Sequence, residues 1–179
     1  IVNKQLVLLS PKSKIGVTEL TYILSQILSA NIVEANTNPS MMDLFNIPQR
    51  ERWALDWRIN PEGFIMGSNK YWLLDPNKKD PIEKSQLEEL LYEVIKTNTL
   101  TLWDGGSSHQ FISYISSRTS VWAITDDVDN VNFTADAFVV NRGEPDSRAI
   151  AVIPDYFEYE KDWNRQINKL VELIRLRSG

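Results

Sequence analysis

The sequence predicts a single α/β domain over residues 1–179, with three layers in which helices flank a mostly parallel sheet. Three observations support this. Short apolar runs alternate with amphipathic segments along the chain, as they do where helices join parallel strands. The length suffices for one core, and no repeat or linker interrupts the chain. The chain begins without an initiating methionine, which is compatible with excision from a longer protein.

The first part of the chain predicts a strand, a helix and a second strand in succession. Lys4–Leu9 is a short apolar run, typical of a buried parallel strand. Over Thr18–Ser29 leucine and isoleucine recur every three or four residues, which predicts an amphipathic helix. Asn31–Ala35 predicts the next strand, and residues 41–48 predict a helical turn. Residues 49–61 are hard to assign, although Trp53 and Trp57 occur there at helical spacing.

The middle of the chain predicts a hairpin, a helix and a strand. Gly63–Met66 and Tyr71–Leu74 lie on either side of the turn sequence Gly67-Ser68-Asn69-Lys70. Further on, Ser85-Gln86-Leu87-Glu88 fits a capping box, which marks a helix start. The helix that follows carries a leucine-rich face as far as Ile95, and Thr99–Trp103 then predicts a strand.

The last part of the chain predicts a short helix at Phe111–Ile115 and strands at Ser120–Ile124, Ala137–Val140 and Ala149–Ile153. Lys161–Arg177 closes the chain as a helix with an apolar stripe and several basic residues. We expect this helix to pack against the sheet. Peripheral contact with a membrane surface is the alternative that its basic residues leave open.

Composition limits the functions open to this chain. The formal net charge of −5 argues against direct nucleic-acid binding through general charge attraction. The absence of cysteine excludes disulfides and thiolate metal sites, and it fits a cytoplasmic location. A single histidine, His109, argues against a histidine-based metal centre or hydrolase triad. No apolar run approaches the roughly 20 residues of a membrane span.

The connection from the first strand to the first helix is the most informative segment. A loop that enters a helix presents backbone N–H groups and the positive end of the helix dipole to an anion. The phosphate-binding pattern G-x-x-x-x-G-K-[ST] is partly met, because Gly16 and Thr18 match its last glycine and its hydroxyl. Ser10 replaces the first glycine and Val17 replaces the lysine. Losing that charge-assisted contact costs about 1.5–3 kcal/mol of phosphate binding.

Four later segments extend this pattern in order. They are Ile32–Thr37, which carries Glu34 and Asn36; Leu100–Gly105, which carries Asp104; Val139–Arg142, which carries Asn141; and Val152–Asp155. Together with the loop they resemble the ParA/MinD group of P-loop ATPases, the deviant Walker A class, and within it most of all the CpaE/TadZ-type pilus-assembly branch. Lys12–Glu19 corresponds position by position to that family's loop K-G-G-V-G-K-T-T, with Ser13 and Lys14 in place of two glycines.

The resemblance implies an ATP site with magnesium. The residues that would contact ATP are Lys12, Lys14, Gly16, Val17, Thr18 and Asn141. Lys12 matches the lysine that, in this family, reaches the partner's nucleotide across a dimer. Thr18 and Asp104 would hold Mg²⁺, and Glu34 and Asp104 are the candidate catalytic residues, with Glu34 placed to orient the attacking water.

Each of these residues also has an ordinary structural explanation. The lysines can face solvent, Thr18 and Asp104 can cap helices or turns, and Glu34 can be a strand-end carboxylate. The lost glycines make a tight phosphate cradle harder to form, and Glu19 places a negative charge near the phosphates. These departures favour weak or absent nucleotide binding.

The function that the resemblance implies is scaffolding or localisation in pilus assembly, secretion or cell-pole positioning. Its partners would be proteins, including a second copy of the chain, and hydrolysis would be weak or absent. A slow Mg-ATPase and an interaction module without nucleotide are the alternatives. Trp53, Trp57 and Trp72 would form a partner-binding patch if exposed together, although we expect them to be buried.

One segment departs from the family. Between the strands at Ser120–Ile124 and Ala137–Val140 the family usually has a helix, whereas this chain has only the polar stretch 126–134. A parallel crossover normally needs a dozen or more residues. We therefore expect this edge of the sheet to be trimmed or rearranged.

Overall fold

The computed structural model describes residues 1–179 and contains one eight-stranded sheet. Its strands are β1 (Gln5–Leu9), β2 (Asn31–Glu34), β3 (Phe64–Met66), β4 (Asn69–Trp72), β5 (Thr101–Asp104), β6 (Ser120–Thr125), β7 (Ala137–Asn141) and β8 (Ala149–Ile153). They lie in the order β3-β4-β2-β5-β1-β6-β7-β8, and every neighbouring pair except β3–β4 is parallel. The predicted α/β class with a mostly parallel sheet is confirmed.

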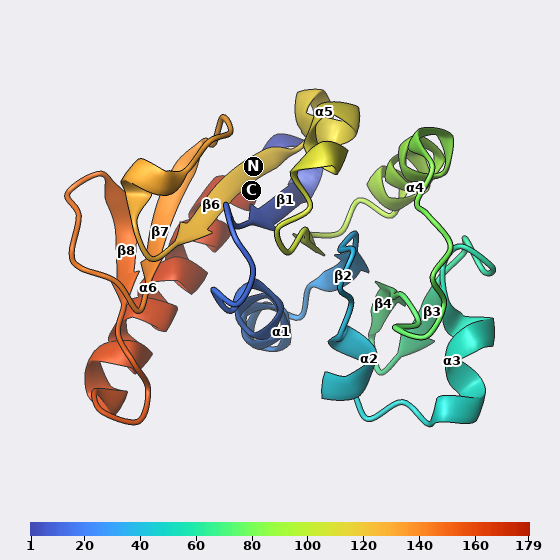
Figure 1. The fold of residues 1–179 in the computed structure, drawn as a ribbon, viewed down its shortest axis with the longest axis horizontal. Coiled ribbons are helices and arrows are strands. Elements are labelled where there is room, and N and C mark those ends of the chain that lie inside the picture. Colours follow the sequence, from blue (N-terminus) through green and yellow to red (C-terminus); the bar gives the residue numbers. More distant parts are fainter.

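Helices cover both faces of this sheet (Figure 1). They are α1 (Val17–Leu28), α2 (Met41–Leu44), α3 (Gln49–Leu55), α4 (Lys84–Lys96), α5 (Ile112–Ile115) and α6 (Glu160–Ser178), with short 3₁₀ helices at Val2–Lys4, His109–Phe111, Ser116–Arg118 and Val128–Asn130. Helices α1 and α6 contact each other on one face, and α4 and α5 contact each other on the other. None of these helices is long and apolar enough to cross a membrane.

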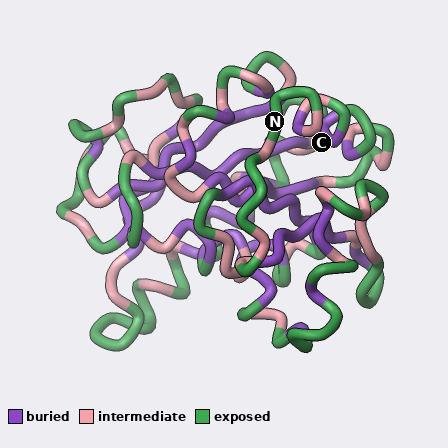
Figure 2. Tube along the Cα trace, turned by 45° about the vertical axis from the view of Figure 1, so that its right-hand side comes forward, coloured by how far each residue is buried: buried purple, intermediate pink, exposed green.

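The core consists of two main layers, one on each side of the sheet. Leu6 and Leu8 of β1 point into the layer under α1 and α6, whereas Val7 and Leu9 point into the layer under α4 and α5. This is why β1 is apolar from Leu6 to Leu9, and the central strands are buried along their length (Figure 2). The apolar stripe of α6 packs into the first layer, as expected.

The tryptophans predicted to be either buried or part of a partner-binding patch lie in different environments. Trp57 and Trp72 are buried in the second core layer, as expected. Trp53 of α3 was also expected in the core, but its residue surface is 59% exposed. The expectation for Trp53 is therefore wrong, because α3 lies at the outer end of the fold and turns this side chain outward.

The capping box of α4 lies two residues before the predicted one. Glu83 is the N-cap residue, and its backbone N–H donates to the Gln86 side-chain oxygen over 3.0 Å, while the Glu83 side chain accepts from the Gln86 backbone. The prediction at Ser85–Glu88 is thus wrong in register. The box starts at a glutamate, which the usual Ser/Thr pattern does not include, and both Lys84 and Ser85 therefore belong to the helix.

The short connection between β6 and β7 keeps the sheet intact. Residues 126–136 contain only a 3₁₀ helix, so the family's helix is absent here, but β6 and β7 remain parallel neighbours. Asp136 makes this possible, because its backbone N–H donates to the Val121 carbonyl and its carboxylate accepts from the Val121 N–H. The crossover is therefore trimmed, which is the first of the two expected alternatives, and the sheet edge is not rearranged.

Gly143 has no space for a side chain beyond the end of β7. A Cβ atom there would lie 2.0 Å from the Asp126 carbonyl oxygen. We expect Gly143→Ala to lower the free energy of unfolding by about 1–3 kcal/mol or more, because backbone must move to accommodate the methyl group. Urea denaturation tests this. Gly67→Ala is the comparison, since Gly67 has open space around it and its loss reflects only the left-handed φ of 68°; a loss in Gly143→Ala no larger than that in Gly67→Ala would contradict the steric explanation.

Candidate anion-binding site at the start of α1

The loop from β1 to α1 forms one wall of a cavity of about 340 Å³, which we call the loop cavity. Its lining consists of residues 12–19 with Asn36, Asn38, Ser40, Gly106 and Ser107. These residues follow the carboxyl ends of β1, β2 and β5, which are neighbours in the sheet. Ligands of open parallel sheets bind at this edge.

Gly16 gives the loop its route into α1. It occupies the N-cap position with φ 94°, a left-handed conformation that favours glycine, and a Cβ there would lie 3.0 Å from the Asn141 amide nitrogen. No side chain caps the helix. Because the first N–H groups of a helix have no partner within it, these groups of α1 are available to an anion.

Buried contacts hold the loop in place at both ends. The Ser10 backbone N–H donates to the Gly106 carbonyl over 2.8 Å, and the Ser10 carbonyl lies 2.7 Å from the His109 Nε2 atom. At the other end the Asn141 amide donates to the Ile15 carbonyl over 2.7 Å. Asn141 therefore positions the loop and is not among the residues that line the loop cavity.

Thr18 and Asp104 lie together beneath the loop. The Thr18 hydroxyl donates to Asp104 Oδ2 over 2.7 Å, joining the first turn of α1 to the end of β5. The other carboxylate oxygen of Asp104 accepts from the Gly106 N–H over 3.0 Å. The structure thus joins two residues that are 86 positions apart and that the sequence pattern paired as magnesium ligands.

Glu34 lies next to Asp104 but is held by backbone. The two residues are register partners in neighbouring parallel strands. Both Glu34 oxygens accept N–H groups, Oε2 from Ser40 and Met41 at 3.0 Å each and Oε1 from Leu74 at 2.9 Å. Glu34 is fully buried and does not line the loop cavity. This arrangement leaves the carboxylate poorly placed to orient a water molecule.

The neighbouring buried carboxyls of Glu34 and Asp104 both have a raised pKa. Burial, and then the charge of Asp104, raise the pKa of Glu34 to about 8. Burial also raises the pKa of Asp104 to about 6, although the Thr18 hydroxyl and the Gly106 N–H oppose the rise. No basic side chain pairs with either carboxylate. The pair is therefore a concentration of buried acid without a counter-charge.

The two lysines of the loop differ in their contacts. Lys12 Nζ forms an ion pair with Asp126 Oδ2 at 2.9 Å, so in this structure the lysine is directed to its own chain. Lys14 is exposed, lines the loop cavity and forms no ion pair, and its φ of 64° is strained for a residue with a side chain. Val17 lies in the core layer beneath α1, and Glu19 lines the cavity.

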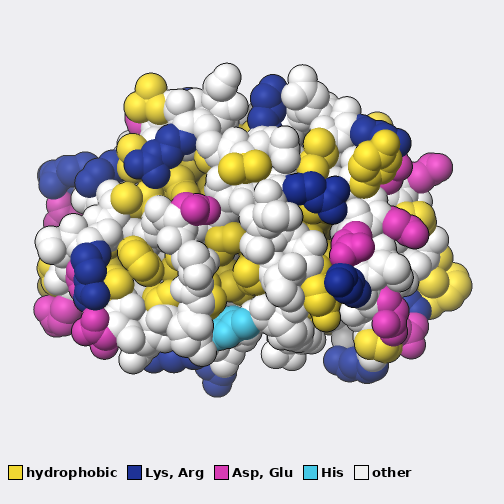
Figure 3. All heavy atoms as spheres, turned by 90° about the horizontal axis from the view of Figure 1, so that it is seen from above, with side chains coloured by type: hydrophobic (Ala, Val, Ile, Leu, Met, Phe, Trp, Pro, Cys, Tyr) yellow, Lys and Arg dark blue, Asp and Glu magenta, His cyan; other side chains and the backbone are white.

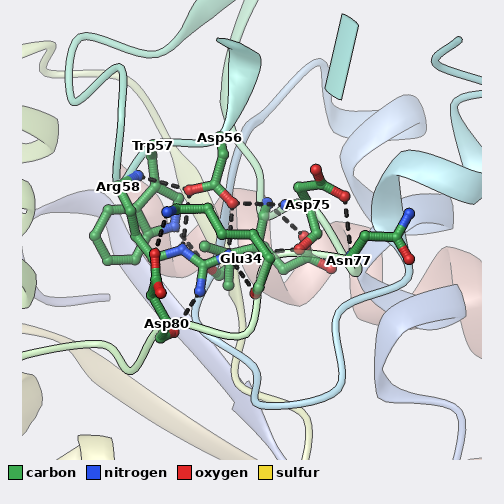
Figure 4. Close-up of polar contacts among 9 residues, drawn as sticks. Glu34, Asp56, Trp57, Arg58, Asp75, Asn77 and Asp80 are labelled. Carbon is green, nitrogen blue, oxygen red and sulfur yellow. Dashed lines mark hydrogen bonds and ion pairs between the residues drawn. The ribbon is translucent and has the colours of Figure 1, made fainter. Parts of the chain in front are cut away.

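A polar network behind Glu34 was not foreseen from the sequence (Figure 4). Arg58 forms a two-pronged contact with the buried Asp56, Nε to Oδ1 at 3.0 Å and Nη2 to Oδ2 at 2.6 Å. Asp56 Oδ2 also accepts the Asp75 N–H over 2.7 Å, next to the Leu74 N–H that binds Glu34. The only signal was the charged Asp-Trp-Arg sequence within a stretch that was hard to assign.

The structure thus gathers Lys12, Lys14, Gly16, Val17 and Thr18 around the loop cavity, with Asp104 and Glu34 behind it. No protein-family model matches this chain, and no curated protein matches its sequence significantly.

Proposed function

We propose that this chain is a degenerate ParA/MinD-like domain that binds a phosphate-bearing ligand weakly, hydrolyses nucleotide slowly or not at all, and acts as a scaffold or localisation module. By the resemblance in its motifs, such modules serve pilus assembly, secretion or cell-pole positioning. Its partners would be proteins, including a second copy of the chain. The observation that carries the proposal is the 2.7 Å hydrogen bond from Thr18 to Asp104 at the uncapped start of α1.

The residues beneath the loop fit magnesium. Carboxylate and hydroxyl oxygens are ligands that Mg²⁺ prefers, and it is commonly held by one or two protein groups together with phosphate oxygens. Thr18, which lines the loop cavity, would hold the ion, with Asp104 directly behind it supplying negative charge through the Thr18 hydroxyl, because Asp104 itself is fully buried and does not line the cavity. When bound, Mg²⁺ would neutralise negative charge on the phosphate.

Three contacts favour binding without efficient hydrolysis. Val17 packs in the core where the family has a phosphate-binding lysine. Glu34 is occupied by backbone N–H groups, so it cannot readily position water. Lys12 is paired with Asp126 in its own chain, so binding a partner's nucleotide would require this ion pair to break. Phosphoryl transfer depends on positioning and charge stabilisation, and each of these contacts removes a part of them.

Calorimetry with Mg-ATP tests this proposal. We expect weak binding, with a dissociation constant of about 0.1–1 mM, or about −5 kcal/mol. Lys14→Gln should weaken it by about tenfold, because a charge-assisted contact worth about 1.5 kcal/mol or more is lost. Lys161→Gln, which removes an equal charge from exposed α6, is the control and should leave binding unchanged. ATP turnover should stay at the level of an Asp104→Asn variant.

Three results would overturn the proposal in different ways. Efficient turnover that Asp104→Asn abolishes would identify the chain as an active Mg-ATPase. No heat at millimolar Mg-ATP or phosphate would leave an interaction module without nucleotide. Equal weakening by Lys14→Gln and Lys161→Gln would show that the loop cavity is not where the anion binds.

A further inference from the structure

A second concavity lies between α4 and the segment that follows α3, and we call it the acidic groove. Its volume is about 810 Å³, within the range of ligand-binding sites, and it shares no lining residue with the loop cavity. Its exposed apolar surface comes from Pro61 and Tyr92, whereas Trp57 and Leu90 also line it but are each only 2% exposed. Acidic, basic and hydrophobic side chains occur together at the right-hand end of Figure 3, the end at which Figure 1 places α4.

The charges around the acidic groove have one dominant sign. The glutamates that line it are Glu62, Glu88, Glu89 and Glu93. Glu62 and Glu89 are exposed and form no ion pair. The one basic residue of the lining, Arg58, already binds the buried Asp56. The groove therefore presents unpaired negative charge beside apolar surface.

One edge of the groove already binds a cation from its own chain. The Lys96 ammonium lies 4.3 Å from the centroid of the Tyr92 ring and 3.2 Å from Glu93 Oε1. An ammonium held between an aromatic face and a carboxylate is a favourable arrangement, because both groups attract positive charge. Glu62 and Glu89 offer further carboxylates to a cation, and no lysine of the chain forms an ion pair with them.

We propose that the acidic groove binds a lysine- or arginine-rich peptide segment of a partner protein. The long stems of these side chains pack along apolar surface while their charged ends reach carboxylates, which matches the lining of the groove. Opposite charge across an interface also speeds association and excludes acidic competitors. This proposal does not depend on ligand binding in the loop cavity.

Fluorescence anisotropy with labelled peptides of about ten residues tests the groove. A peptide that alternates lysine with leucine should bind, and a version with glutamine in place of lysine should bind about tenfold more weakly or not at all. The double variant Glu62→Lys/Glu89→Lys should weaken binding of the lysine peptide by about tenfold or more. Raising NaCl to about 0.5 M should weaken it as well, since exposed charges are screened.

A matched double variant distinguishes the effect of charge in the groove from the effect of the overall charge of the chain. Glu158→Lys/Glu172→Lys makes the same change of charge at exposed positions outside the groove, and it should leave the peptide affinity within about twofold of the unmodified chain. Equal weakening by both double variants would overturn the proposal, as would equal binding of the glutamine peptide. Spermine that binds as tightly as the peptide would show a site for small polyamines instead.

Discussion

The free energy of unfolding should fall as the pH rises from about 5 to about 8. Glu34 and Asp104 have a raised pKa in the folded protein, to about 8 and about 6, mainly because they are buried. Between their unfolded and folded pKa values the folded state binds more protons than the unfolded state, so stability decreases with pH. The stabilisation is complete below the unfolded pKa values and is lost as the pH passes the folded ones.

The pH range chosen isolates this pair from the other shifted carboxyls. Asp80 and Asp146 have a lowered pKa because of hydrogen bonds from Lys78 and Arg148, so they titrate below the range tested. One pKa unit corresponds to about 1.4 kcal/mol, so we expect a fall of a few kcal/mol across the range. Urea denaturation at several pH values measures it.

The variant Glu34→Gln assigns the effect. It removes the ionisable group, so its stability should change less with pH than that of the unmodified chain, whatever its absolute stability. Glu89→Gln, at an exposed position, should keep the original dependence. A flat or rising stability from pH 5 to 8 in the unmodified chain would contradict the raised pKa values. An unchanged slope in Glu34→Gln would assign the effect to other groups.

Part of the Glu34–Asp104 site can be predicted from the sequence. The strand endings at Glu34 and Asp104 could be predicted, because apolar runs end there and parallel strands bring their carboxyl ends to one edge. The three N–H groups that bind Glu34 could not be predicted. They come from residues 40, 41 and 74, and their positions depend on how two loops pack against the end of β2. The contacts that a carboxylate makes, more than its presence, decide its chemistry.

The limits of the fold prediction have similar causes. Strands such as β8, at Ala149–Ile153, were predicted with their true ends because hydrophobic pattern and burial agree. The hairpin was predicted with a four-residue turn, but Asn69 belongs to β4 and the turn has only Gly67 and Ser68. Asn69 is polar, yet its side chain donates to the Ala30 carbonyl over 2.8 Å, and this long-range contact draws it into the sheet. Helix α3 was missed because it is short and mostly exposed.

Arg58→Met should cause one of the largest losses of stability in the chain. Asp56 is fully buried, the Arg58 side chain is 6% exposed, and the two form a two-pronged ion pair. Removing the arginine leaves a buried carboxylate without its counter-charge, which costs about 3–5 kcal/mol. Arg148→Met is the matched control, because Arg148 makes a similar contact with Asp146 but its side chain is 51% exposed. That variant should lose much less stability, because solvent screens an exposed ion pair.

Arg58→Met should also change the titration of Glu34, because Asp56 holds the segment whose backbone binds Glu34. Asp56 Oδ2 accepts the Asp75 N–H, and the adjacent Leu74 N–H donates to Glu34 Oε1. If Arg58→Met loosens this segment, Glu34 loses a donor that lowers its pKa, and the fall of stability with pH should extend to higher pH. Adding Asp56→Asn to Arg58→Met removes the unpaired charge and should recover part of the stability. Equal losses in Arg58→Met and Arg148→Met would contradict the role of burial, and an unchanged pH dependence would show that the network ends at Asp56.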